Sequence, residues 1–305
     1  MDIKLVISQM VELFLILALG YIAAKKKVVG PKFGTQLSNF ILSITLPCMM
    51  LASVATMPED TDNNNVLMMF VIAILFYVVM PFIAYFIARI LLVKKEDRHM
   101  YMYMTIWSNV GFMGFPVIAS IFGEGAIFYA TIFNLIFNVS NFTLGIMLMS
   151  KEGRKALDFK KFLSPGIVSS IAAVIMFSIH LKLPALLNDT LKTVGDTTTP
   201  LAMVVIGIAL SGITVRSVFT EFRLYPYVII KQILLPLMAW AILKNVIVNP
   251  YLLGIVIVII AMPVATSSVL FANRYENNVA LATKGVFLTT LASVVTIPMI
   301  SFLLM

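Results

Sequence analysis

Residues 108–116 read Ser-Asn-Val-Gly-Phe-Met-Gly-Phe-Pro and interrupt an apolar run that is long enough to cross a membrane. Two glycines and a proline within Gly111–Pro116 disfavour a continuous helix, because proline removes an amide donor and clashes with the preceding turn. Backbone groups freed at membrane depth are tolerated only when they are buried in protein or line a watery cavity. The stretch predicts a helix broken at Gly111–Pro116, with the Asn109 amide beside it able to bind an ion or a carboxylate. The alternative is a kinked helix whose glycines allow close packing.

A second interruption lies at residues 262–268, which read Met-Pro-Val-Ala-Thr-Ser-Ser. Three hydroxyl groups follow Pro263, and they either satisfy the freed backbone or face a substrate. If the two breaks cross near the middle of the bilayer, the N-termini of the half-helices point their positive dipole ends at one place. That arrangement favours an anionic ligand.

The composition around these interruptions is that of a membrane protein. Apolar residues make up 61% of the 305 residues and charged residues 12%, against roughly 45–50% and about 25% in soluble domains. The single cysteine, Cys48, lies in an apolar run and excludes a disulfide framework. The +8 net charge sits in short loops between apolar runs, so it indicates topology and not nucleic-acid binding. The sequence predicts ten spans, at about 5–24, 35–56, 66–93, 100–121, 125–149, 163–181, 192–213, 224–244, 250–273 and 279–304.

The distribution of cations predicts the orientation of these spans. Of the 22 Lys and Arg residues, two lie inside spans, and only Lys4, Lys182, Lys192 and Lys244 lie in one of the two sets of loops. The remaining cations lie in the other set, which the positive-inside rule places in the cytoplasm. Both termini are therefore predicted to be extracytoplasmic, and the hydrophilic linker at 150–162 cytoplasmic.

The linker separates two halves, 1–149 with helices 1–5 and 163–305 with helices 6–10. Because each half holds an odd number of spans, the second must enter the membrane upside down relative to the first. Prolines recur at similar places in the two halves, which favours an inverted repeat, the arrangement that points to a binding site at interrupted helices. The pairs are Pro47 with Pro200, Pro81 with Pro236, and Pro116 with Pro263.

These motifs resemble the auxin efflux carrier family, which includes plant auxin exporters and bacterial malate and malonate permease-like proteins. Asn109, Gly114 and Pro116 match its span-4 pattern, and the segment from Asn39 to Pro47 is similar too. The second signature resembles Met262-Pro263, the sequence Phe-Ala-Asn-Arg-Tyr at 271–275 and the run at 283–298. The resemblance covers essentially the whole chain.

The resemblance implies an all-α membrane protein of ten helices in two inverted five-helix repeats, with broken helices 4 and 9 crossing in a mobile core. It also implies a scaffold of spans 1, 2, 6 and 7, an elevator-like movement and a homodimer. Two departures point away from auxin as the substrate and towards a bacterial plasma-membrane protein. The linker at 150–162 is short where plant exporters carry a long loop, and Ser268 stands where plant members show a second proline.

Other polar residues inside the spans offer further candidates. Asn134, Asn138 and Asn141 share one face of span 5, where they either bond neighbouring helices or line the site. For Lys231 and Lys284 the alternatives are snorkelling to the interface and neutralising a substrate carboxylate, with Lys284 the better candidate. Glu12 in span 1 is interpreted as an interface residue, with proton coupling as the alternative. The candidate substrate-binding residues are Asn109, Gly111, Gly114, Pro116, Asn134, Asn138, Pro263, Thr266, Ser267, Ser268 and Lys284.

The sequence thus predicts a secondary transporter of a small organic anion, a mono- or dicarboxylate, across the plasma membrane. The expected partners are the anion, the lipid bilayer and a second copy of the chain, with no nucleic acid, no metal site and no cofactor. Coupling to protons or sodium is left open, as are the substrate and the direction of transport. A membrane-embedded sensor or channel is the alternative. An enzyme is not expected, because the spans hold no serine–histidine pair and no pair of buried aspartates.

Overall fold

The computed structural model describes residues 3–55, 63–150, 165–212 and 221–303. Within these residues the chain is helical apart from turns, short irregular connections and an isolated bridge between Ser108 and Val264. Six of the described helices are long and apolar enough to cross a membrane. The predicted linker at 150–162 lies outside the described residues except for Ser150.

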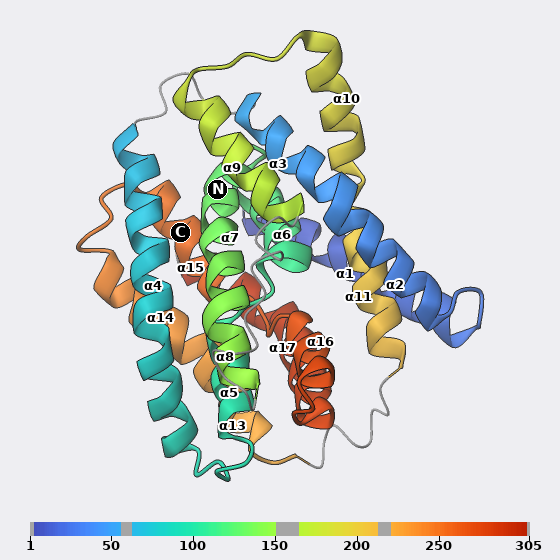
Figure 1. Cartoon of the computed structure of the whole chain (residues 1–305), viewed down its shortest axis with the longest axis vertical. Coiled ribbons are helices and arrows are strands. Elements are labelled where there is room, and N and C mark those ends of the chain that lie inside the picture. Colours follow the sequence, from blue (N-terminus) through green and yellow to red (C-terminus); the bar gives the residue numbers. More distant parts are fainter. Residues whose placement is uncertain (1–2, 56–62, 151–164, 213–220, 304–305) are drawn as a thin grey trace. The chain divides into compact units, whose positions relative to one another are not determined.

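The described helices follow the chain as shown in Figure 1. Those of the first half are α1 (Ile3–Lys25), α2 (Pro31–Phe40), α3 (Leu46–Ala55), α4 (Asn63–Ile90), α5 (Arg98–Ile106), α6 (Phe115–Phe122), α7 (Ala126–Ser140) and α8 (Ile146–Met149). Those of the second half are α9 (Pro165–Ser178), α10 (Ala185–Asp196), α11 (Thr198–Ser211), α13 (Leu224–Ile229), α14 (Leu235–Leu243), α15 (Pro250–Ala261), α16 (Ser267–Arg274) and α17 (Val279–Leu303). The described residues include four π-helical turns: η1 (Ile41–Thr45), η3 (Asn141–Gly145) and η6 (Ile230–Leu234) each join two helices, and η2 (Val110–Gly114) leads into α6.

Three of the π-helical turns have a common cause in the sequence. η1, η2 and η6 each end two residues before a proline, at Pro47, Pro116 and Pro236. Proline cannot donate the usual helical hydrogen bond, and its ring crowds the carbonyl one turn earlier. A π-helical turn adds a residue to that turn and so accommodates the ring without ending the helix.

The chain divides into two compact units, each built from both halves of the sequence. Unit 1 comprises Met1–Met69, Val110–Leu135 and Phe162–Gly212. In it α1 packs along α11, α3 packs on α9 and α10, and α2 packs on α11. Glycines at Gly20 and Gly207 make the α1–α11 approach possible, because a Cβ at either position would overlap the backbone of the facing helix.

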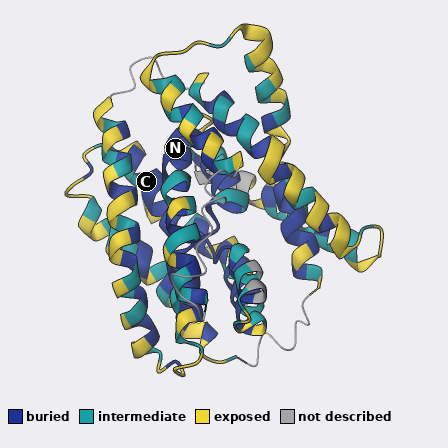
Figure 2. Cartoon of the chain, in the orientation of Figure 1, coloured by how far each residue is buried: buried dark blue, intermediate teal, exposed yellow. Residues whose placement is uncertain are grey.

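Unit 2 comprises Phe70–Asn109, Ile136–Lys161 and Ile213–Met305. Here α14 and α17 pack against α15, and α16 packs against α17, α5 and α8. Almost every side chain of α15 from Leu252 to Ala261 is buried, so this helix lies at the centre of the unit. Figure 2 shows the contrast with α4, which alternates between buried and exposed positions along its length.

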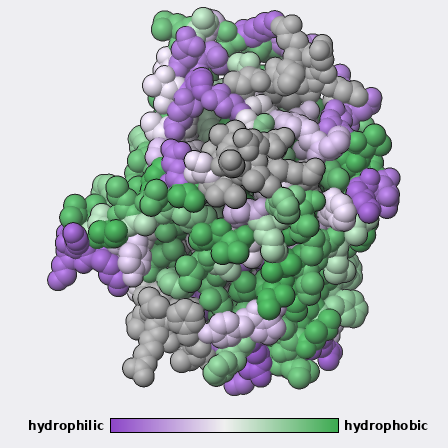
Figure 3. Space-filling view, turned by 180° about the vertical axis from the view of Figure 1, so that it is seen from behind, coloured by the Kyte–Doolittle hydropathy of each residue, from purple (hydrophilic) through white to green (hydrophobic). Residues whose placement is uncertain are grey.

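The exposed surface is strongly apolar. On α4 the exposed side chains include Leu75, Val78, Phe82 and Phe86, each more than half exposed. Figure 3 shows apolar residues, in green, over much of the face that it presents. Such a surface is costly in water and is expected where lipid tails surround a helix.

Two predictions need correction. The stretch Gly111–Pro116 is helical, so the predicted position of the first break is wrong; Pro116 is the second residue of α6, where a missing amide costs little. The span predicted at 192–213 begins earlier, at Ala185, because α10 and α11 follow one another with only Thr197 between them.

Candidate functional site

Two helices of unit 2 are interrupted, and the interruptions meet. α5 ends at Ile106, and the backbone of Trp107 is extended, with φ −101° and ψ 104°. α15 ends at Ala261, and helical structure resumes only at Ser267. Both interruptions fall within spans that the sequence predicts to be broken, the second at the predicted Pro263.

The two interrupted segments bind each other through their backbones. The Asn109 N–H donates to the Pro263 carbonyl oxygen over 2.7 Å, and the Ala265 N–H donates to the Trp107 carbonyl oxygen over 3.1 Å. Ser108 and Val264 face each other between these bonds in an antiparallel bridge. All six residues are buried, so the pairing satisfies backbone groups that lipid could not.

At the second interruption, a side chain accepts a backbone hydrogen bond. Pro263 has no amide hydrogen, and the next amide, that of Val264, donates to the hydroxyl of Thr289 on α17 over 3.1 Å. The Thr289 hydroxyl in turn donates to the Gly285 carbonyl oxygen over 2.7 Å. Gln232 donates its side-chain amide to the Thr289 carbonyl oxygen over 2.9 Å, which ties η6 to the same point.

Lys231 of η6 also contacts the crossing, by which we mean the paired backbone segments 107–109 and 263–265. Its side chain is fully buried, and its Nζ donates to the Ser108 hydroxyl over 2.7 Å and to the Ile260 carbonyl oxygen over 3.1 Å. Of the two alternatives for Lys231, snorkelling to the membrane interface is therefore wrong. Its Nζ joins both interrupted segments and does not extend towards water.

Beside the crossing, a short network of polar and aromatic side chains includes Ser267. The Tyr103 hydroxyl donates to Asn141 Oδ1 over 2.6 Å and lies 3.3 Å from the Ser267 hydroxyl oxygen. The ring of Phe271 lies 5.5 Å from that of Tyr103, between centroids. Trp107 donates its indole N–H to the Ser140 hydroxyl over 3.0 Å, which orients the first segment against α7.

The other candidate residues of unit 2 lie around this crossing or on the helices next to it. Thr266 and Ser267 are half-buried at the start of α16, and Ser268 is fully buried. No hydrogen bond within the described residues reaches the Ser268 hydroxyl. Asn138 on α7 and Lys284 on α17 are half-buried.

Four candidates, Gly111, Gly114, Pro116 and Asn134, belong to unit 1. Gly114 and Pro116 are buried where η2 passes into α6, and Gly111 is half-buried with open space where a Cβ would project. Asn134 is buried on α7. The structure therefore brings Asn109 and Pro263 together directly, while these four are described only within their own unit.

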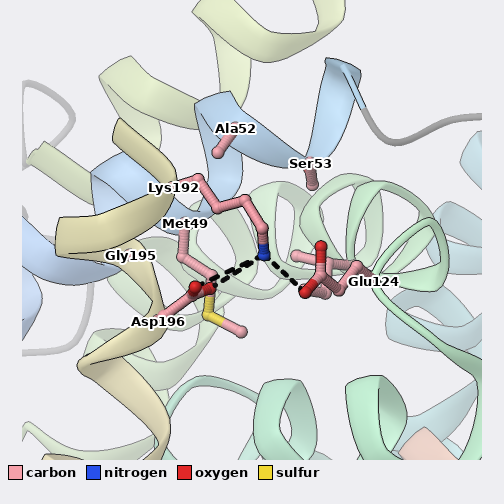
Figure 4. Close-up of a pocket in the computed structure, with 8 residues that line it drawn as sticks. Met49, Ala52, Ser53, Glu124, Lys192, Gly195 and Asp196 are labelled. Carbon is pink, nitrogen blue, oxygen red and sulfur yellow. Dashed lines mark hydrogen bonds and ion pairs between the residues drawn. The ribbon is translucent and has the colours of Figure 1, made fainter. Parts of the chain in front are cut away.

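Unit 1 also contains a small pocket, shown in Figure 4. Lys192 extends from α10 into it, and its Nζ lies 2.6 Å from a carboxylate oxygen of Glu124 and 3.3 Å from one of Asp196. Met49 and Ala52 of α3 supply apolar walls. Two carboxylates already neutralise this cation, so the pocket is a poor site for an anion.

Several residues at the crossing were missed from the sequence, above all Thr289, Gln232 and Tyr103. Each lies in a long apolar span, and nothing in a single sequence tells which face of such a span meets the crossing. The adjacent Lys231 and Gln232, polar and charged within an apolar run, were the available signal. Within the described residues, no group of three or more His, Cys, Asp or Glu is placed to hold a metal ion.

Comparison with known proteins agrees with this architecture. A family model described as "Membrane transport protein" matches residues 5–158 and 155–301. The chain is 23% identical to an uncharacterized transporter of Methanocaldococcus jannaschii, over 100% of this chain and 99% of the relative. It is also 23% identical to an uncharacterized transporter of Methanothermobacter thermautotrophicus and 19% identical to the uncharacterized transporter YfdV of Escherichia coli K12, with 96% of each chain covered in both cases.

Proposed function

Since the chain belongs to the auxin efflux carrier family of membrane transport proteins, we propose that it carries a small organic anion, a mono- or dicarboxylate, across the plasma membrane. One observation carries the proposal: two helices are interrupted at the same place and are held there by mutual backbone hydrogen bonds. Irregular backbone inside a membrane protein is typical of the place where a transporter binds its substrate.

In this proposal the anion binds at the start of α16, beside the crossing. A helix N-terminus carries partial positive charge and amides without helical partners, which favours an anion. Thr266 and Ser267 place hydroxyls there, and the buried Ser268 hydroxyl is without a hydrogen bond within the described residues. Asn109 and Pro263 fix the backbone that turns towards this point.

The remaining candidates stay part of the proposed site. Gly111, Gly114 and Pro116 shape the start of the other half-helix, and Asn134 and Asn138 share one face of α7. Lys284 on α17 is half-buried and is proposed as a cation for the substrate carboxylate. No cofactor is proposed, and protons, sodium or the anion gradient itself are the candidate driving forces.

At the scale of the fold we propose ten membrane helices in two inverted five-helix repeats, 1–149 and 163–305, with crossed helices 4 and 9. Helical segments of the described chain lie within every predicted span, which supports the number. Unit 1 holds the described helices of spans 1, 2, 6 and 7, which the resemblance assigns to a scaffold. An elevator-like movement against this scaffold, in a homodimer with extracytoplasmic termini, completes the proposal.

Counterflow in proteoliposomes tests the function. Vesicles loaded with unlabelled malate or malonate should accumulate the same labelled anion against its gradient, because a carrier exchanges substrate in each cycle. A channel gives no such stimulation from the opposite side, and a sensor binds the anion without any flux. Anion binding in a thermal-shift assay without counterflow would contradict the carrier and favour the sensor.

A further inference from the structure

Lys231 is the most unusual charged residue of the described chain, because its whole side chain is buried. An ammonium removed from water is strongly unfavourable unless other groups replace its hydration. Two oxygens do so here, the Ser108 hydroxyl at 2.7 Å and the Ile260 carbonyl at 3.1 Å. One oxygen comes from each interrupted segment.

The Ile260 carbonyl is available because of the local sequence. In an unbroken helix it would accept a hydrogen bond from the amide four residues later, that of Val264. The helix ends at Ala261, and the Val264 amide donates instead to the Thr289 hydroxyl. The Ile260 carbonyl therefore lies at the C-terminus of the twelve-residue α15, where partial negative charge favours a cation.

Lys231 has no carboxylate partner among the ion pairs of the described residues. Its neighbours are neutral oxygens, the kind of ligand that binds a hard metal cation. A tethered ammonium at this place gives the positive charge and the hydrogen bonds that a bound metal cation would otherwise give.

We infer that Lys231 is a built-in cation that occupies the place of a coupling metal ion at the crossing of the two interrupted segments. The inference rests on the proposed function for its two consequences, which are that the positive charge serves the anion and that transport does not require sodium. Lys231 acts as a positioning residue: it holds Ser108 and the end of α15 together and keeps the crossing positively charged for the anion. Unlike a dissolved ion, it cannot leave with the substrate.

The first test uses thermal unfolding of the purified protein and needs no substrate. The wild type should melt at the same temperature in sodium chloride and in choline chloride of equal concentration. Lys231→Ala opens a space of the size of an alkylammonium ion and should melt several degrees lower. Ethylammonium chloride should restore most of the loss, and choline, which is too large, should not.

Lys244→Ala is the matched control. Lys244 is exposed at the end of α14, with its Nζ 4.5 Å from the centroid of the Trp240 ring. This variant should melt close to the wild type, and ethylammonium should not shift it. Saturable stabilisation of the wild type by sodium would overturn the inference, as would a Lys231→Ala protein that ethylammonium leaves unchanged.

Lys231→Met serves if the alanine variant does not fold, because it keeps the volume and removes the charge. It should fold, lose counterflow and show no response to ethylammonium, since the space is filled. Counterflow equal to the wild type in Lys231→Met would show that the charge is not needed. If the wild type itself shows no counterflow in any buffer, the proposed function fails, while the melting experiments still decide the role of Lys231.

Discussion

Single side chains complete the backbone at the crossing, and Thr289 is a clear case. Its hydroxyl accepts the Val264 amide inside the protein, where no water or lipid can replace it. Thr289→Val should therefore lower the free energy of unfolding by about 1–3 kcal/mol, the cost of a buried donor left without a partner. Chemical unfolding in detergent measures this loss.

Thr290→Val is the matched control for that variant. The Thr290 hydroxyl is equally buried but has no hydrogen bond within the described residues. The same substitution should therefore leave stability unchanged or raise it slightly. Equal destabilisation by the two variants would show that the Thr289 hydroxyl has no special role.

Asn109 combines a structural and a proposed binding role, and the two can be separated. Asn109→Ala keeps the backbone N–H that donates to Pro263, so the variant should fold and insert. The side-chain amide is lost, and uptake should fall by about 10- to 100-fold, the value of a hydrogen bond to a charged ligand. Uptake of labelled anion, normalised to folded protein in the membrane, gives the answer.

Asn245→Ala provides the comparison, because Asn245 is exposed after α14. It should transport like the wild type. If Asn109→Ala also transports like the wild type, the Asn109 side chain does not belong to the substrate site.

Residue chemistry alone drew attention to two residues of this crossing. Asn109 and Pro263 stood out because an amide side chain and a proline are unusual inside apolar runs. In the structure the Asn109 N–H donates to the Pro263 carbonyl oxygen over 2.7 Å. The burial of Lys231 could not be predicted in the same way. Whether a long cationic side chain turns to the interface or to the interior depends on the helices that surround it.

Helix contacts depend on glycine where two helices approach most closely. Gly207 of α11 faces Leu17 and Tyr21 of α1, and a Cβ at this position would overlap their backbone atoms. Gly207→Ala should force α1 and α11 apart and lower the free energy of unfolding by about 1–3 kcal/mol, as overpacking does elsewhere. Thermal unfolding in detergent measures the effect.

Gly30→Ala is the control for this contact, because a Cβ there would have open space on all sides. Its φ of −119° is also accessible to alanine. It should change stability little. A Gly207→Ala protein as stable as this control would show that α1 and α11 can separate without cost.

At the level of helices, the sequence located one break correctly and misplaced the other. Pro263 lies within its break, whereas Pro116 is the second residue of α6, which the π-helical turn η2 joins to the preceding residues. Proline is compatible with a first helical turn as well as with an interruption, so its presence alone does not distinguish them. The true first break lies at Trp107–Asn109, where pairing with a distant segment and not local propensity decides the backbone.

Topology is a property of the whole molecule and is tested by accessibility. A single cysteine at position 156, in the linker outside the described residues, should react with a membrane-impermeant maleimide only from the cytoplasmic side. The reason is the excess of Lys and Arg in the loops on that side. Labelling in intact cells and in inverted vesicles distinguishes the two orientations.

The experiment requires a Cys48→Ser background, since Cys48 is the only natural cysteine. A cysteine at position 182 is the control and should react from the opposite side. Labelling of position 156 in intact cells would reverse the predicted orientation.

At the scale of the whole molecule, composition predicted the helical class and the approximate spans. Long apolar runs fixed the helical class and the approximate spans, because only helices satisfy the backbone of such runs in lipid. The division into units was not predictable from the order of the spans. Unit 1 joins residues 110–135 to the first part of each half, and such long-range packing leaves no periodic signal.

Backbone hydrogen bonds hold the crossing together. Every amino acid except proline supplies the same backbone donor and acceptor. Replacement of Ser108 or Val264 would change the side chains beside the crossing but keep its backbone hydrogen bonds. Substrate preference can therefore change while the pairing of the two segments is kept. Only proline is incompatible, at Asn109 or Ala265, because it would delete a donor. Most mutations that change what binds beside the crossing therefore leave its backbone geometry unchanged.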